Sequence, residues 1–156
     1  MVEPPISEIS EWSWLKIARK ELGVKETAGP EDNPRVVEYL KSTTLGRPDN
    51  ENDETPWCSC FFNWVLKQTL INPRTNAAWA RSWLNWGVPT EDPKPGTVVI
   101  FSRGTNAGHM GFYLDEDDDS IQVWGGNQGN KVCVLISVLL LSFCVLFCAI
   151  LGKGNY

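Results

Sequence analysis

The sequence is poor in positive charge. Its 156 residues include 14 Lys and Arg against 19 Asp and Glu, so the net charge is −5 and the pI is near 4.9. Proteins that bind nucleic acid need a basic stripe to displace counterions from the phosphates, and this composition supplies no basic excess. We therefore expect no nucleic-acid partner.

Two features of small secreted proteins are also missing. Met1–Pro5 lacks a basic n-region, and no apolar signal-peptide core follows it. Cys58 and Cys60 lie two residues apart and the other three cysteines lie in an apolar run near the C-terminus, whereas a disulfide framework spaces paired cysteines through loops. We expect synthesis in the cytoplasm without a signal peptide, and folding under reducing conditions.

Apolar residues are abundant but unevenly distributed. Hydrophobic residues make up 42% of the chain and eight are Trp, which is typical of a globular protein of one domain. Every acidic residue lies before Lys131, and the twenty residues Val132–Leu151 contain no charge, Gly or Pro. We therefore divide the chain into a globular domain over 1–131 and an apolar C-terminal tail over 132–156.

The tail allows three interpretations. Twenty apolar residues meet the length of a membrane-spanning helix, about 18–20 residues. Val132–Val138 also reads as one more strand of the domain, although buried strands are usually only about 4–8 residues long. An altered C-terminus is the third option. We expect a strand that begins near Lys131 and gives way to an apolar helix or a disordered tail, with membrane contact through Val132–Leu151 left open.

Helical periodicity comes first along the chain and strand patterns follow it. Helices are predicted over Glu11–Leu22 with Ser10 as N-cap and Gly23 as stop, from Asn33-Pro34 onward, from Trp57 or Cys58 onward, and over Asn76–Leu84 with Thr75 as cap. Strands are predicted over Thr97–Phe101, His109–Leu114 and Ile121–Trp124, with an acidic hairpin turn from Asp115 to Ser120. This order predicts an α+β fold with an antiparallel sheet.

Cys58 is the strongest candidate nucleophile. It follows Pro56-Trp57 and precedes a helical run, so we expect it in the first turn of a helix. The unpaired N–H groups and the macrodipole at such a position favour an anion and lower the pKa of a thiol. His109, the only histidine, could take the thiol proton, although a single histidine is more often structural than catalytic.

Cys60 is the competing thiol. Two residues further along a helix its side chain points about 200° away from that of Cys58, so only one of the two can face His109. The neighbouring Phe61 and Phe62 favour a place for Cys60 in the core. A metal site is disfavoured because Cys-x-Cys on a helix cannot converge on one ion and a second histidine is absent.

A third candidate is the segment Trp124-Gly125-Gly126-Asn127-Gln128. Two glycines after a strand allow another part of the backbone to approach closely. They leave the Asn127 amide near the strand end, where it could accept the imidazole N–H and orient the base. An ordinary polar turn has the same composition, so both interpretations stay open.

The order of five motifs resembles the papain-like cysteine peptidases of the NlpC and CHAP (cysteine, histidine-dependent amidohydrolase/peptidase) superfamily, in particular a subgroup from bacteria and their phages. The resemblance spans about Trp14 to Lys131. Its motifs are Asp53-Glu54-Thr55-Pro56-Trp57-Cys58-Ser59, Ala80-Arg81-Ser82-Trp83-Leu84-Asn85-Trp86-Gly87, Pro95-Gly96-Thr97-Val98-Val99-Ile100-Phe101, Gly108-His109-Met110-Gly111-Phe112-Tyr113 and Gly125-Gly126-Asn127-Gln128.

The resemblance implies a papain-like fold and a catalytic set. Cys58 is then the nucleophile, His109 the general base and Asn127 the residue that orients the base. The implied substrate is an amide bond of bacterial peptidoglycan, cleaved at the cell wall by a phage lysin or a wall-remodelling enzyme without a metal or organic cofactor. The oligomeric state is not indicated.

A different class of function remains as the alternative. A membrane-anchored or inactive relative would act as a binding or interaction module without turnover, and Val132–Leu151 is the segment that separates the two hypotheses. Among Trp79, Trp83 and Trp86, any exposed ring could stack on sugars, although Trp at this spacing more often belongs to the core.

Overall fold

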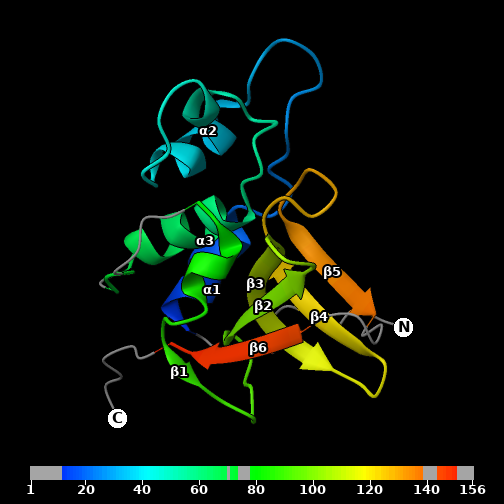
Figure 1. Ribbon diagram of the computed structural model, residues 1–156. Coiled ribbons are helices and arrows are strands. Elements are labelled where there is room, and N and C mark those ends of the chain that lie inside the picture. The colour runs from blue at the N-terminus through cyan, green and yellow to red at the C-terminus, as the bar shows by residue number, and fades with distance from the viewer. Residues whose placement is uncertain (1–11, 70, 74–77, 139–143, 151–156) are drawn as a thin grey trace.

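One helix packs on an antiparallel sheet and two further helices pack against that helix, as predicted for an α+β fold (Figure 1). The computed structural model describes residues 12–69, 71–73, 78–138 and 144–150. Its helices are α1 (Ser13–Lys20), α2 (Pro34–Lys41) and α3 (Cys58–Lys67), with the 3-10 turns η2 (Asp49–Glu51) and η3 (Ala80–Trp83). Its strands are β1 (Val88–Pro89), β2 (Val98–Arg103), β3 (Ala107–Glu116), β4 (Ser120–Gly125), β5 (Cys133–Val138) and β6 (Cys144–Ala149).

Local capping signals account for the helix boundaries. Asn33 precedes α2, and its side-chain oxygen accepts a hydrogen bond from the Arg35 N–H at 2.8 Å, while Pro34 occupies the first helical position. The turn after α1 ends at Gly23, whose φ of +87° is the left-handed conformation that glycine adopts without strain. The predicted cap Ser10 lies outside the described residues.

The predicted fourth helix is reduced to a short turn. Within Asn76–Leu84, the described residues form only the 3-10 turn η3, and Thr75 lies outside the described residues. The Trp83 indole N–H donates to Ser59 Oγ at 2.7 Å, which joins η3 to α3. The hydrogen bond and the burial of Trp83 hold this segment against α3 even though it does not continue as an α-helix.

The sheet has the strand order β1-β6-β2-β3-β4-β5, and each neighbouring pair is antiparallel. The acidic turn predicted between β3 and β4 is confirmed. Asp117 Oδ1 accepts hydrogen bonds from the N–H groups of Asp119 and Ser120 and from the Ser120 hydroxyl. These donors hold the pKa of the Asp117 carboxyl below its ordinary value, first through the Asp119 N–H and then through the Ser120 hydroxyl.

The apolar tail contributes two strands to this sheet. β5 pairs with β4, as expected for a strand that begins near Lys131, but the expected apolar helix or disordered tail is wrong for residues 144–149. Those residues form β6, which lies between β1 and β2 (Figure 1). No helix within the described part of the chain is long and apolar enough to cross a membrane. The domain boundary at Lys131 stays a prediction.

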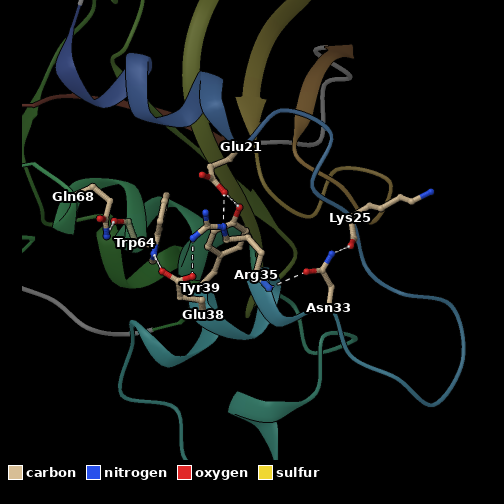
Figure 2. Close-up of polar contacts among 8 residues, drawn as sticks. All are labelled: Glu21, Lys25, Asn33, Arg35, Glu38, Tyr39, Trp64 and Gln68. Atoms are coloured by element: carbon tan, nitrogen blue, oxygen red, sulfur yellow. Dashed lines mark hydrogen bonds and ion pairs between the residues drawn. The ribbon is translucent and has the colours of Figure 1, made fainter.

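A polar network joins the three helices (Figure 2). The Tyr39 hydroxyl on α2 donates to Oε2 of buried Glu21, just after α1, at 2.5 Å, and Arg35 Nε lies 3.1 Å from the same oxygen. Glu38 on α2 accepts the Trp64 indole N–H of α3 at 3.0 Å. Burial and the bond to Glu21 raise the pKa of Tyr39, so its hydroxyl keeps its proton and remains a donor.

Tyr39→Phe should lower the free energy of unfolding by about 2 kcal/mol, because the variant removes a buried hydrogen bond to a carboxylate. Urea unfolding followed by circular dichroism measures the change. Asp92→Asn is the control, since it breaks the exposed Lys94–Asp92 pair and should leave the midpoint close to that of the parent. Equal midpoints for Tyr39→Phe and the parent would contradict the stabilising role of this bond.

Candidate active site

The candidate nucleophile lies where the sequence predicts it, at the first residue of a helix. α3 begins at Cys58, and Trp57 immediately before it accepts the Phe61 N–H at 2.8 Å, which closes the first helical turn. Cys58 is 9% exposed and belongs to the buried core cluster, so it keeps a small accessible surface. α3 packs against β3, the strand that carries His109 (Figure 1).

Cys60 lies in the core, as its apolar neighbours suggest. Its side chain has no exposed surface. Burial, with a smaller contribution from the nearby Cys58, raises the pKa of the Cys60 thiol to about 12. A thiol with this pKa is almost entirely protonated at neutral pH and is a poor nucleophile. This difference in burial favours Cys58 over Cys60 as the reactive thiol.

His109 is held between a strand neighbour and an amide. In the register of β2 and β3 it lies opposite Phe101, and the two rings are stacked at a centroid distance of 6.3 Å. Its Nε2 lies 2.9 Å from Oε1 of Gln128, which follows β4. His109 is 9% exposed and Gln128 is 3% exposed, so this contact is shielded from most solvent competition.

The partners of Gln128 determine which nitrogen of His109 carries the proton. The Gln128 amide nitrogen donates to the backbone oxygens of Val123 at 3.2 Å and Cys133 at 2.6 Å. The amide oxygen is therefore the atom that faces His109, and an amide oxygen only accepts. Nε2 of His109 must then be the donor, which leaves the lone pair of the neutral ring on Nδ1. Gln128 thus favours the neutral tautomer of His109 whose Nδ1 carries no proton.

Asn127 does not occupy the place that the sequence analysis assigned to it. The contact with the imidazole belongs to its neighbour Gln128, while the Asn127 amide faces Trp57 and Glu26. The physical reason is the backbone at Asn127, whose φ of +56° turns successive side chains in different directions. Gln128 belongs to the motif Gly125-Gly126-Asn127-Gln128, so the sequence placed it near the site without giving it a role. No feature of the sequence pointed to Glu26.

The structure also bears on a metal site and on a tryptophan that could stack on sugars. Among the residues that the structure describes, no group of three or more His, Cys, Asp or Glu side chains could hold a metal ion. Trp83 is buried, whereas Trp79 is 52% exposed and its indole N–H donates to the Asn106 backbone oxygen at 2.8 Å. Of the three candidate tryptophans, Trp79 presents the largest exposed fraction.

A cysteine at the start of a helix that packs on an antiparallel sheet with the histidine defines a papain-like α+β arrangement. The family model for the CHAP domain matches residues 50–127, half of the 156-residue chain, and the chain belongs to this family. The family implies a hydrolase of the amidase or peptidase type that acts on peptidoglycan. A comparison with curated proteins found no match.

Proposed function

We propose that this protein cleaves an amide bond in bacterial peptidoglycan with Cys58 as nucleophile and His109 as general base. The observation that carries the proposal is the hydrogen bond of His109 to Gln128, whose amide nitrogen is already engaged by two backbone oxygens. That arrangement leaves Nδ1 of His109 as the proton acceptor. Gln128 takes the orienting role in place of Asn127, and the site of action is the bacterial cell wall, as for a phage lysin or a wall-remodelling enzyme.

The reaction follows from these roles. His109 takes the thiol proton while the Cys58 sulfur attacks the amide carbonyl carbon and forms a C–S bond. The oxyanion that develops accepts hydrogen bonds from backbone N–H groups at the start of α3, including that of Cys58. His109 then gives the proton to the amine nitrogen as the C–N bond breaks. Water hydrolyses the resulting thioester by the same proton transfers in reverse.

Digestion of purified peptidoglycan by the full chain tests the proposal. Mass analysis of the released fragments should show that one water is added for each bond cut, with a new carboxyl group on one product and a new free amine on the other. The masses also identify which amide bond is cut. His109→Ala is the control and should release no fragments above background. Absence of release by the parent would overturn the proposal and favour a binding module without turnover.

Alkylation of Cys58 gives a second prediction that does not depend on substrate. Iodoacetamide reacts with thiolates, and an imidazole that accepts the thiol proton increases the thiolate fraction at neutral pH. We expect Cys58 to be labelled faster in the parent than in His109→Ala, as measured by peptide mass mapping over time. Cys60, with a pKa of about 12, should remain largely unlabelled in both proteins. Equal rates for Cys58 would show that the two side chains do not share a proton.

A further inference from the structure

The turn after β4 presents two neighbouring amide side chains to two different parts of the site. Gln128 contacts His109, as described above. Asn127, one residue earlier, contacts Trp57, the residue directly before Cys58. The side chains diverge because Asn127 adopts a left-handed backbone conformation, which Asn tolerates better than most residues. One turn therefore touches both the base and the start of the nucleophile's helix.

The Asn127 contact is part of a closed network of three residues. Glu26 Oε1 accepts the Trp57 indole N–H at 2.8 Å and lies 3.2 Å from one of the two terminal atoms of the Asn127 amide. The other terminal atom of the Asn127 amide lies 3.1 Å from the backbone nitrogen of Trp57. A carboxylate can only accept, so the amide nitrogen of Asn127 must face Glu26 and its oxygen must accept the Trp57 N–H. Trp57 is thus held through its backbone and its side chain at once.

Close packing supports the same arrangement. A Cβ at Gly126 would lie 2.6 Å from Cζ3 of Trp57 and 2.6 Å from Cβ of Phe61, so the backbone of the turn rests directly on α3. Trp57 has no exposed surface. Glu26 is tied to the other end of the turn, since its N–H donates to the Asn130 oxygen at 2.9 Å. The hydrogen bonds of the network are therefore made between well-packed elements.

We propose that Asn127 and Glu26 are positioning residues for the nucleophile, acting through Trp57 to set where Cys58 stands relative to His109. The inference rests on the proposed function. Gln128 holds the base and Asn127 holds the start of α3, so the short turn fixes the relative placement of the two reacting groups. A displacement of a reacting group by about 1 Å can slow catalysis about 100-fold even where no substrate contact is lost.

Asn127→Asp is the first test. The new side chain keeps an oxygen for the Trp57 N–H and tolerates the left-handed backbone, but it loses the N–H donor and sets a carboxylate against Glu26. We expect kcat on peptidoglycan to fall about 10- to 100-fold. KM should stay close to the parent value because Asn127 acts through Trp57 and not on substrate.

A double variant tests the contact itself. In Asn127→Asp combined with Glu26→Gln, the glutamine oxygen can accept the Trp57 indole N–H and its nitrogen can donate to the new carboxylate. All three hydrogen bonds are then possible again once the glutamine amide turns its nitrogen toward residue 127, and donor and acceptor are exchanged only between residues 26 and 127. We expect the double variant to recover most of the kcat lost in Asn127→Asp. A double variant as impaired as the single one would overturn the proposed network.

Asn130→Asp is the matched control. Asn130 lies in the same turn, also has a positive φ (62°) and is exposed, so the substitution adds the same charge at an equivalent backbone conformation. It should leave kcat unchanged. If Asn127→Asp does not fold, Asn127→Gly replaces it, because glycine keeps the backbone conformation and removes both hydrogen bonds. Parental kcat in the folded Asn127 variant would overturn the inference.

The rate of Cys58 alkylation by iodoacetamide separates this inference from the proposed function. A displaced Cys58 should react more slowly in Asn127→Asp, and the rate should recover in the double variant, whether or not the parent hydrolyses peptidoglycan. Failure of hydrolysis in the parent with this pattern intact would reject the function alone. Equal alkylation rates in the parent and the Asn127 variants would reject the positioning role alone.

Discussion

Cys58→Ser should reduce peptidoglycan hydrolysis at least about 1,000-fold, because replacing a catalytic nucleophile removes nearly all covalent catalysis. A hydroxyl has the geometry of the thiol but is a far weaker acid, so His109 cannot activate it to the same extent. The measurement is the initial rate of fragment release by the full chain. Both proteins should have the same unfolding midpoint within error, since the two side chains are similar in size.

Cys60→Ala is the matched control for this experiment. Cys60 is the neighbouring thiol on α3, is buried and has a pKa of about 12. Its loss should lower the free energy of unfolding by about 1 kcal/mol through the small cavity it leaves, and hydrolysis should stay near the parent rate. If Cys58→Ser and Cys60→Ala lose activity equally while both remain folded, the assignment of Cys58 is refuted.

A chain that ends after Lys131 should not fold cooperatively. The truncation removes β6 from its place between β1 and β2, removes β5 from the edge beside β4, and deletes buried Val132. The backbone of Val132 also donates to Val24 and accepts from Gly23, so a link to the end of α1 is lost as well. Circular dichroism and urea unfolding measure the effect. A soluble 1–131 fragment with a cooperative transition would contradict the prediction.

Two point variants in the full chain test whether β6 is part of the buried core, by comparing a buried residue of β6 with an exposed apolar residue of β5. Cys148 on β6 is 1% exposed, so Cys148→Asp should lower the free energy of unfolding by about 3–5 kcal/mol, the cost of a buried charge without a partner. Leu135 on β5 is 42% exposed, and Leu135→Asp should cost about 1 kcal/mol or less. Equal effects would show that β6 does not form part of the core.

Features that depend on a few neighbouring residues were predicted correctly. The cap of α2 and the acidic turn before β4 rest on contacts across two or three residues, and the first turn of α3, which begins at Cys58, closes across four. Such contacts can be predicted from a short stretch of sequence, because the groups that make them are neighbours along the chain in any fold.

The long apolar run shows the opposite case. The run is long enough for a membrane-spanning helix. Nothing in its composition indicates that residues 144–149 pair with residues 98–102, far earlier in the chain. Strand pairing depends on which edges are open once the other strands are in place. The same holds for Glu26, which meets Trp57 across thirty-one residues.

By itself, the sequence determined the class of the protein: the α+β order, Cys58 at a helix start, a single histidine, and the motifs of the CHAP family. Only the tertiary structure decided which amide of the Asn127–Gln128 pair contacts His109 and which faces the start of α3. Adjacent residues of the same chemistry are indistinguishable in a sequence. The left-handed φ at Asn127 and the elements packed on either side of the turn send one amide to His109 and the other to Trp57.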